Sequence, residues 1–528
     1  MFCGLKMVGI KIKKEKVPII LIIFSIILAL VTFSLVPFSG GDNFTYFLLG
    51  RALAKGKGYI ELWDPSHPLH TQYPPIFPIL LIPAAFLNSY LLAKLIVFLC
   101  FIFLLFFSYL LFLELDYSNS KMISIVALAF LAFSPGLLEY SHWVLSDIPY
   151  LLFSVLSLLS WSKKRYNLAL FFSIIGFFTR TAGISLLIAV IGFYILKSKI
   201  ERKKTIIPLL ALLFIPIWII YGKVFGSQFQ RSYFQQLISK DPYNPSMGNI
   251  GILNLIFRIG KNILRMFLKI LPNIFFGEIK ILLISLSISI ILLSLLSFGV
   301  VSEKIFFKKT DEEKKSSFST LNLINTYMFL YLLTVWSWPV IWTVDKRLYL
   351  PILPWLAFCL AKGSVRITRL FQKGIAKKFP FFITGLLVAN CVFIALTSSN
   401  ELWKNNMKWI KEKIPSGRAF YFKDYINIKN WALREKIQEN SVFMVRKQTA
   451  FHYFTDFPTA PVPQTENPEE LKNIIETKKV DYIVLSPLFK SYPIVVKGMN
   501  GLKEEYNWKL VYIEPDNKVF VFKCIKRK

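Results

Sequence analysis

The sequence predicts an all-α membrane bundle of about eleven transmembrane helices, followed by a small soluble α/β domain. Hydrophobic residues make up 55% of the 528 residues, and 50 residues are Phe, which is more apolar surface than a soluble core can bury. Apolar runs of spanning length recur up to residue 397, whereas residues 400–528 contain none. These observations place the membrane domain at residues 1–399 and the soluble domain at residues 400–528.

Eleven apolar stretches are predicted to be transmembrane helices, although several are short for a hydrocarbon core of about 30 Å. If the N-terminus lies in the cytoplasm, most Lys and Arg residues before residue 400 fall in cytoplasmic loops, as the positive-inside rule requires. An odd number of spans then places the C-terminal domain outside the cytoplasm. We therefore expect a multi-pass protein of the inner cell membrane. The stretches are residues 17–38, 91–113, 121–139, 148–162, 166–179, 181–197, 205–225, 279–301, 319–343, 347–361 and 380–397.

The first long outer loop is predicted at residues 39–90. It begins with a short helix at residues 43–54, which Gly56 and Gly58 end. A Pro-rich apolar segment at residues 73–87 follows and is too short to span the bilayer. Counting it as a span would also reverse the side of every later loop. We expect this segment to lie on the outer surface, or to re-enter it under a cover of protein.

The second long outer loop is predicted at residues 226–280 and carries a basic stripe. Spacings of three and four residues place the members of the stripe on one face of a helix, mostly apart from its apolar residues. This pattern is typical of an amphipathic helix at the membrane interface, and it favours contact with lipid over a catalytic role. The stripe consists of Arg258, Lys261, Arg265 and Lys269.

The C-terminal domain is predicted to be α/β, because short β-rich stretches alternate with helical segments. Residues 467–470 (Asn-Pro-Glu-Glu) combine a capping side chain, a Pro in the first turn and two acids, which indicates the start of a helix. Residues 514–517 (Glu-Pro-Asp-Asn) are typical of a hairpin turn. The expected strands are residues 441–446, 480–486, 508–514 and 518–523.

Charge and motif content exclude several classes of function. The chain has 63 Lys and Arg against 31 Asp and Glu, a net charge of +32 that in a soluble protein would suggest binding to nucleic acid. Because most of this excess lies in predicted cytoplasmic loops, we assign it to orientation and to anionic membrane lipids instead. The five Cys form no CxxC pair, and no glycine-rich nucleotide-binding motif occurs. A disulfide framework, a zinc finger and a nucleotide cofactor are therefore not expected.

Two acidic residues at predicted outer helix ends are the candidate catalytic residues. Asp42 precedes the helix at residues 43–54, and Asp147 precedes the span at residues 148–162. A helix cap would also explain each of them. Acids near a membrane bundle are nevertheless functional candidates by default, and these two face the same side. Asp42 is then a general base at the membrane surface, and Asp147 is a ligand for the acceptor or for a metal ion.

Cations at the same outer ends are candidates for binding phosphate. Arg347 begins a span, and Arg180 lies between two apolar runs. Each is either an anchor at the membrane surface or a phosphate clamp, because a guanidinium matches phosphate oxygens bidentately. Arg258, Lys261 and Arg265 of the basic stripe are further candidates for contacting a phosphate.

A metal site has weaker support in the sequence. His67 and His70 lie near acidic residues in the first outer loop, and Asp147 is a third candidate ligand. Their spacing matches no metal-binding motif. We therefore assign no metal ligands and leave a divalent cation open as a cofactor.

Five segments share a pattern with a known group of enzymes. They are Gly41–Tyr59, Tyr73–Pro78, Ser134–Pro149, Arg347–Pro354 and Asn467–Leu485. The sequence resembles the GT-C superfamily of integral-membrane glycosyltransferases over most of its length. It is most similar to the glycosyltransferase family 39 branch that contains protein O-mannosyltransferases, aminoarabinose transferases and the bacterial Rgt-like enzymes.

The resemblance implies an enzyme that takes a sugar from a polyprenyl phosphate and transfers it, with inversion, on the outer face of the membrane. The acceptor would be a lipid, a glycan or a protein. It implies that Asp42 is the base and that Asp147 shapes the acceptor or metal site. Many relatives carry a second acid beside the first, whereas this chain has Asn43 there. That departs from the protein O-mannosyltransferase pattern and from a base built of two carboxylates.

Two other functions fit part of the sequence. A transporter or flippase of lipid-linked sugars would share the spans and the phosphate-binding cations, but it predicts charged residues at mid-membrane or paired broken helices. A non-catalytic scaffold would use the soluble domain to bind a partner. The candidate acids gather at the outer ends of the helices, which favours the enzyme.

Overall fold

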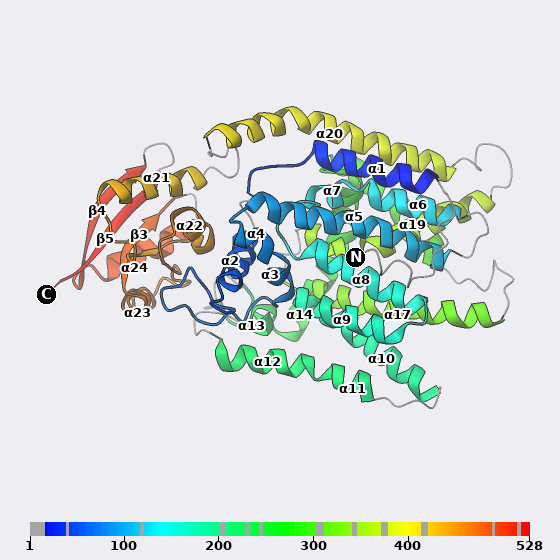
Figure 1. The fold of residues 1–528 in the computed structure, drawn as a ribbon, viewed down its shortest axis with the longest axis horizontal. Coiled ribbons are helices and arrows are strands. Elements are labelled where there is room, and N and C mark those ends of the chain that lie inside the picture. The colour runs from blue at the N-terminus through cyan, green and yellow to red at the C-terminus, as the bar shows by residue number, and fades with distance from the viewer. Residues whose placement is uncertain are drawn as a thin grey trace.

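The computed structural model describes a helical bundle with a small sheet domain at one end (Figure 1). Several segments lie outside the described residues. They include residues 515–517 of the predicted turn and the basic stretches on which the predicted orientation depends, which are residues 1–15, 201–205, 301–310 and 371–378. The described residues are 16–37, 42–116, 121–200, 206–226, 233–241, 247–279, 281–300, 311–339, 346–370, 379–412, 421–487, 491–514 and 519–527.

A helix forms within each of the eleven stretches that were predicted to span the membrane, because each is a long apolar run. α1 and α20 run side by side along one edge of the bundle, and α11 and α12 lie at the opposite edge (Figure 1). The bundle helices are α1 (Lys16–Val31), α5 (Tyr90–Leu115), α6 (Met122–Ala132), α7 (Pro135–Tyr140), α8 (Asp147–Ser162), α9 (Tyr166–Thr179), η3 (Thr181–Gly183), α10 (Ile184–Ile200), α11 (Ile206–Leu212), α12 (Phe214–Phe225), α16 (Leu282–Val300), α17 (Asp311–Ser337), η7 (Lys346–Ile352), α19 (Leu353–Leu370) and α20 (Phe379–Glu412).

Six helical segments in the described part of the chain are long and apolar enough to cross a membrane, judged by length and composition. They are Tyr90–Leu115, Thr181–Lys199, Ile206–Phe225, Leu282–Gly299, Lys346–Ile367 and Phe379–Glu412. Four shorter apolar helices accompany them: Lys16–Val31, Met122–Ala132, Asp147–Ser162 and Tyr166–Thr179. The count of eleven spans therefore stays a prediction.

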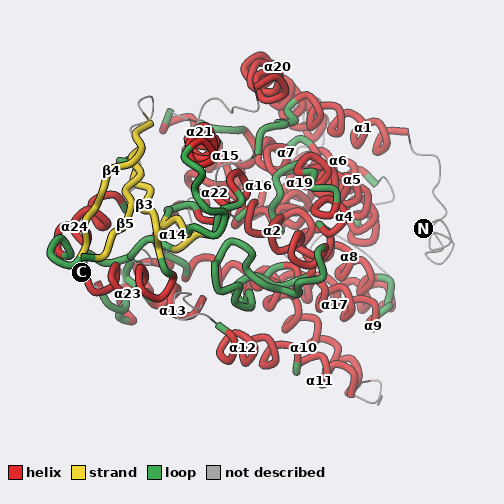
Figure 2. The backbone as a smooth tube through the Cα atoms, turned by 60° about the vertical axis from the view of Figure 1, so that its left-hand side comes forward, coloured by secondary structure: helices red, strands yellow, loops and turns green. Residues whose placement is uncertain are grey.

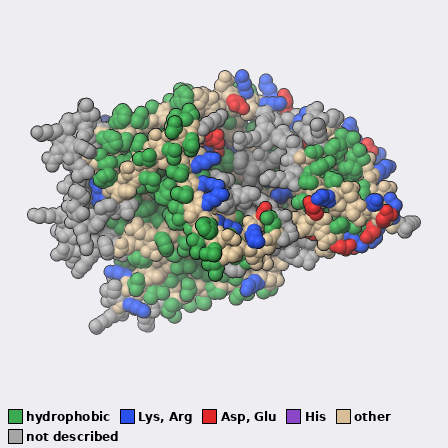
Figure 3. Space-filling model, turned by 180° about the vertical axis from the view of Figure 1, so that it is seen from behind, with side chains coloured by type: hydrophobic (Ala, Val, Ile, Leu, Met, Phe, Trp, Pro, Cys, Tyr) green, Lys and Arg blue, Asp and Glu red, His purple; other side chains and the backbone are tan. Residues whose placement is uncertain are grey.

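The outer surface of the bundle is apolar. Figure 3 shows hydrophobic side chains spread over one face of the bundle and mixed charges on the C-terminal domain. α12 buries none of its residues, and Leu282 and Leu283 at the start of α16 are exposed. Exposed apolar side chains on this scale indicate a surface that contacts lipid.

The first outer loop folds as predicted around a short helix. α2 (Asn43–Ala54) has the expected bounds, because Gly56 and Gly58 adopt positive φ angles that other residues rarely reach. The Pro-rich segment forms two short helices that pack on α2, so it does not cross the bundle. A Cβ added at Gly50 of α2 would lie 3.1 Å from the carbonyl oxygen of Pro78, so the glycine allows this close packing. The two helices are α3 (Ile76–Leu80) and α4 (Ile82–Phe86).

The second outer loop contains an amphipathic helix, as predicted. Ile252 and Phe257 on its apolar face are exposed, whereas Arg258 and Asn262 are buried against the bundle. The face toward solvent or lipid is therefore the apolar one. The helices of this loop are α13 (Tyr233–Ile238), α14 (Ile252–Arg265), a π-helical turn (Met266–Ile270) and α15 (Leu271–Phe276).

The C-terminal domain holds a five-stranded sheet in the order β2-β1-β3-β5-β4 (strands yellow in Figure 2). β1 pairs in parallel with β2 and β3, and β5 pairs antiparallel with β3 and β4. A strand forms in each predicted stretch, and the short β2 was not predicted. The elements are α21 (Tyr421–Arg434), β1 (Val442–Met444), α22 (Gln448–Thr455), β2 (Thr459–Ala460), α23 (Pro468–Lys478), β3 (Val480–Leu485), α24 (Tyr492–Gly501), β4 (Tyr506–Glu514) and β5 (Val519–Lys526).

Two local features of this part can be compared with the sequence. The Asn467 side chain accepts a hydrogen bond from the Glu469 amide at 3.0 Å, so it caps α23 as predicted. α20 continues to Glu412, so the boundary that composition placed at residue 400 falls inside a helix. The chain becomes polar at residue 400 without losing helix-forming residues, and composition therefore changes before the secondary structure does.

The C-terminal domain packs on the first outer loop. The ring of Phe44 in α2 contacts Phe422 and Tyr453, with centroids 5.4 and 4.8 Å away. The Thr459 amide donates a 2.6 Å hydrogen bond to the carbonyl of Trp63. The two parts therefore share one end of the bundle, and the outward orientation of this end stays a prediction.

Candidate active site

Asp42 occupies the N-cap position of α2, but its side chain makes no capping hydrogen bond to that helix. The sequence left a helix cap as the alternative to a catalytic role for Asp42, but the carboxylate does not cap α2 in this structure. Its side chain is 30% exposed, and Oδ2 lies 3.9 Å from Nη2 of Arg347. A carboxylate in this position can be reached by a ligand.

Three tyrosines lie near enough to Asp42 to be affected by its charge. Tyr46 follows Asp42 by one helical turn, Tyr73 comes from the Pro-rich segment, and Tyr233 comes from α13 in the second outer loop. Burial raises the pKa of each tyrosine above its usual value, and the negative charge of Asp42 raises it further. All three hydroxyls therefore stay protonated near neutral pH and can donate hydrogen bonds.

Asp147 begins α8 and forms an ion pair with Arg180, which follows α9. Asp147 is only 1% exposed. A carboxylate at this depth is unfavourable unless it is paired, and the guanidinium supplies that pairing. The preceding Ser146 places its hydroxyl 3.1 Å from that of Tyr46, so the pair lies beside the tyrosines of Asp42.

Arg347 joins the same cluster from η7. Its positive charge acts on Arg180 and on Tyr233, and its guanidinium faces Asp42. Four residues singled out in the sequence are therefore brought together by α2, α8, the α9–η3 connection and η7. The cluster pairs two carboxylates with two guanidinium groups: Asp42, Asp147, Arg180 and Arg347.

The basic stripe of α14 is divided between different roles. Arg258 is buried, and its guanidinium donates hydrogen bonds of 2.8 Å to the carbonyls of Leu237 and Ser239. It therefore ties α14 to the end of α13, and burial lowers its pKa. The contact with lipid or phosphate expected for Arg258 stays a prediction, while in this structure its guanidinium is held by protein carbonyl groups.

Two other residues of the stripe lie differently. Lys261 is exposed. Arg265 is half-buried, and its charge acts on the hydroxyl of Tyr349, two residues after Arg347. Of these two cations, Arg265 is thus the one near a residue of η7, the element that carries Arg347.

Comparison with known proteins places this arrangement in a structural context. No protein-family model matches the sequence, and no curated protein matches it either. ArnT from Cupriavidus metallidurans bound to undecaprenyl phosphate is a solved structure with a TM-score of 0.52 and 10% identity, covering 96% of this chain and 97% of that one. The oligosaccharyltransferase of Archaeoglobus fulgidus, tethered to an acceptor peptide, has a TM-score of 0.52 and 12% identity, covering 98% of this chain and 74% of that one.

A third structure, AglB from Archaeoglobus fulgidus with an inhibitory peptide and a dolichol-phosphate, has a TM-score of 0.51 and 12% identity. It covers 98% of this chain and 75% of that one. These proteins are GT-C superfamily glycosyltransferases. The chain has the GT-C fold. The fold that the sequence resemblance implied is confirmed, with its helical bundle and C-terminal domain.

The histidines of the first loop serve other partners in this GT-C fold. His70 places Nδ1 2.8 Å from Oε1 of Glu61, and its Nε2 accepts a 3.1 Å hydrogen bond from the Tyr73 amide. Nδ1 of His67 lies 3.3 Å from the Glu61 carbonyl.

Three ring nitrogen atoms of His67 and His70, which were candidate metal ligands, already contact Glu61 or Tyr73. An Archaeoglobus fulgidus oligosaccharyltransferase structure was solved with Zn and sulfate. In the described part of this chain, no three His, Cys, Asp or Glu side chains are grouped to hold a metal ion. Asp147, the third candidate ligand, is paired with Arg180. The candidate ligands therefore do not form a binding set here.

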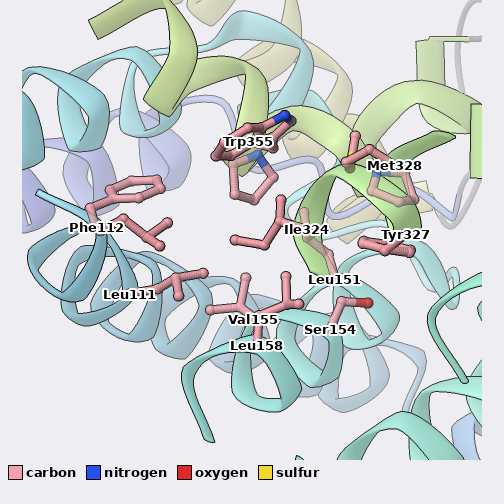
Figure 4. A pocket seen from close by; sticks show the side chains of 13 residues that line it. Leu111, Phe112, Leu151, Ser154, Val155, Leu158, Ile324, Tyr327, Met328 and Trp355 are labelled. Carbon is pink, nitrogen blue, oxygen red and sulfur yellow. The ribbon is translucent and has the colours of Figure 1, made fainter. Parts of the chain in front are cut away.

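An apolar cavity lies within the bundle between α5, α8, α17 and the start of α19. Figure 4 shows Phe112, Val155, Ile324 and Trp355 pointing into it. Tyr327 at its edge is hydrogen-bonded to Tyr150, with 3.1 Å between the hydroxyl oxygens. α8 lines the cavity and also carries Asp147, so the apolar cavity and the charged cluster share a wall.

Three tyrosines at the site were not among the predicted site residues. Tyr46 lies four residues after Asp42, and this spacing on a helix could have identified it. Tyr73 belongs to a segment that carried the resemblance, but no role was given to it. Tyr233 belongs to a different loop, and no signal near Asp42 in the sequence points to it.

Proposed function

We propose that this protein is a membrane glycosyltransferase that transfers a sugar from a polyprenyl phosphate to a hydroxyl acceptor on the outer face of the cell membrane. The observation that carries the proposal is the convergence of an accessible carboxylate, Asp42, with the guanidinium groups of Arg347 and Arg180 at the ends of apolar helices. Structures of the same fold bound to undecaprenyl phosphate and to a dolichol-phosphate support the donor class.

The chemistry of the cluster suits an inverting transfer. The acceptor oxygen bonds to the anomeric carbon, and its proton passes to the carboxylate of Asp42. The bond from the anomeric carbon to the phosphate oxygen breaks, and the electron pair leaves on the phosphate. Arg347 and Arg180 stabilise the negative charge that develops there, so they favour the transition state over the bound substrate. Attack from the side opposite the phosphate inverts the anomeric centre.

Asp147 has a different role in this proposal. Its carboxylate is buried and held by Arg180, so we assign it to positioning that guanidinium. The base is then a single carboxylate, which agrees with Asn43 in place of a second acid. We place the donor tail along the apolar side chains that line the cavity beside α8. These side chains must move apart to admit a tail, because the cavity itself measures only about 20 Å³.

Transfer by the purified full chain in lipid nanodiscs tests this proposal. Undecaprenyl phosphates that carry labelled hexoses or pentoses are supplied with extracts of envelope lipids and glycans as acceptors. Asp42→Asn is expected to lower the rate of transfer by about 10²- to 10⁴-fold. Asp456→Asn, at an acid with a side chain 68% exposed, serves as the matched control and is expected to keep the rate.

Two results would contradict the proposal. One is the absence of transfer from every polyprenyl-phosphate sugar, and the other is full activity of a folded Asp42→Asn protein. A flippase would instead move the labelled lipid across a proteoliposome bilayer without forming a new glycosidic bond. A scaffold would do neither.

A further inference from the structure

The C-terminal domain brings a second cation, Lys447, to the candidate base. Lys447 is the N-cap residue of α22, as Asp42 is the N-cap residue of α2. The first turns of these two helices meet: Oγ1 of Thr449 lies 3.4 Å from Oγ1 of Thr45. Because each threonine follows its N-cap residue within one turn, the contact places Lys447 close to Asp42.

The electrostatics of Lys447 agree with this position. Its side chain is partly buried; burial and the neighbouring Arg446 lower its pKa, while the charge of Asp42 opposes this shift. Among the described residues, no hydrogen bond or ion pair of 4.0 Å or less involves the Lys447 side chain, whereas its backbone carbonyl accepts a hydrogen bond from the Phe451 amide. Other cations at the contact between the C-terminal domain and the first outer loop form ion pairs: Lys478 with Asp64, and Arg51 with Asp456.

Lys447 and Arg347 reach Asp42 from different parts of the protein. Arg347 belongs to the bundle, where the apolar tail of a donor would hold the leaving phosphate. Lys447 belongs to the C-terminal domain. In a displacement with inversion, the acceptor approaches from the side opposite the leaving group. The domain side of Asp42 is therefore the side of the acceptor.

We propose that Lys447 binds an acidic group on the acceptor, a carboxylate or a phosphate, so that the enzyme selects acceptors whose reactive hydroxyl lies beside a negative charge. The Lys447 ammonium is partly buried and lies near the Asp42 charge without forming a close ion pair with it. An acidic acceptor group that bonds directly to the ammonium offsets the cost of this burial on binding. This inference rests on the proposed function for the role of Asp42, but the anion site itself does not require it.

Binding measurements on the purified full chain in nanodiscs test the inference. The probes are octyl β-D-glucuronide and octyl β-D-glucoside, which differ only at C6, where the first has a carboxylate and the second a hydroxymethyl group. Binding of undecaprenyl phosphate is measured separately. The wild type is expected to bind the glucuronide about tenfold more tightly than the glucoside. Lys447→Gln is expected to abolish this difference, and Lys447→Arg to retain it. Lys497→Gln, on the exposed face of α24, is the matched control.

The outcomes separate this inference from the proposed function. Equal affinity of the wild type for the two probes overturns the inference, and so does a preference that persists in Lys447→Gln. Unchanged binding of undecaprenyl phosphate shows that Lys447→Gln is folded. If the wild type prefers the glucuronide but does not bind undecaprenyl phosphate, the proposed donor is contradicted, whereas the site for an acidic group is still supported. Free glucuronic acid, added as a competitor, distinguishes a soluble acidic acceptor from a lipid-borne one.

Discussion

Asp64 of the first outer loop and Lys478 of the C-terminal domain form a buried ion pair between residues that are 414 positions apart in the sequence. Nζ of Lys478 lies 2.8 and 2.7 Å from the two carboxylate oxygens, and it donates a further 3.0 Å hydrogen bond to Ser66. Each side chain of the pair is less than 10% exposed. The pair fixes the domain against the loop that carries Asp42.

Replacing Lys478 by Met is expected to loosen this contact, because it leaves a buried carboxylate without its cation, at a cost of about 3 kcal/mol. The Thr459 amide, which donates to the carbonyl of Trp63 across the contact, reports the change. Hydrogen exchange at this amide should accelerate in Lys478→Met. The control Lys497→Met removes an exposed ion pair with Glu466 and should leave exchange unchanged. Equal exchange in both variants would show that the pair does not hold the domain.

Asp147→Asn is expected to destabilise the protein by roughly 3 kcal/mol, because it leaves Arg180 beside a neutral side chain at a buried position. Chemical denaturation in detergent measures the free energy of unfolding. The double variant Asp147→Asn/Arg180→Gln removes both charges and should be more stable than Asp147→Asn alone. Additive effects of the two substitutions would contradict a direct pair.

The sequence predicts the elements around the site better than the contacts within it. The helices follow from apolar runs, and the end of α2 follows from Gly56 and Gly58, because these signals are local. The approach of Arg347 to Asp42 depends on the packing of η7 against α8 and α7, which are distant in the sequence. Helical spacing and charge type indicated which residues lie at the outer ends, but not which of them touch.

The surroundings of two cations could not be predicted from the sequence, for the same physical reason. Spacing placed Arg258 on a basic face of α14, but it does not reveal which element covers that face. The carbonyl groups at the end of α13 cover Arg258 and bind its guanidinium. Lys447 was missed for the converse reason, since nothing near it in the sequence shows that α22 packs on α2.

Glu61 and His70 form a chain of contacts that we expect to position Tyr73. The carboxylate of Glu61 holds the ring of His70, and His70 accepts a hydrogen bond from the Tyr73 amide. The hydroxyl of Tyr59 also donates a 2.8 Å hydrogen bond to the carbonyl of Tyr73. These contacts fix the backbone of Tyr73, a residue near enough to Asp42 to be affected by its charge, so a shift here changes the surroundings of the base.

Glu61→Gln is expected to lower kcat for sugar transfer by roughly 10- to 100-fold, because small displacements of a catalytic group have effects of this size. The affinity for undecaprenyl phosphate should stay the same, since no donor contact changes. If Glu61 acts through Tyr73, then Glu61→Gln in a Tyr73→Phe background should cause little further loss. A full additional loss in the double variant would assign Glu61 a role apart from Tyr73.

The last prediction tests whether the apolar cavity binds the donor tail or is a packing defect. Val155 of α8 points into the cavity and is buried. Val155→Phe should fill part of it and raise KM by about tenfold for an undecaprenyl-phosphate donor, whose tail would lose several buried methylene groups. A methyl-phosphate donor, which has no isoprene unit to place in the cavity, should keep its KM. Leu168→Phe on the exposed face of α9 is the matched control. If Val155→Phe instead raises the stability of the protein and leaves both KM values unchanged, the cavity is a packing void and the donor tail lies elsewhere.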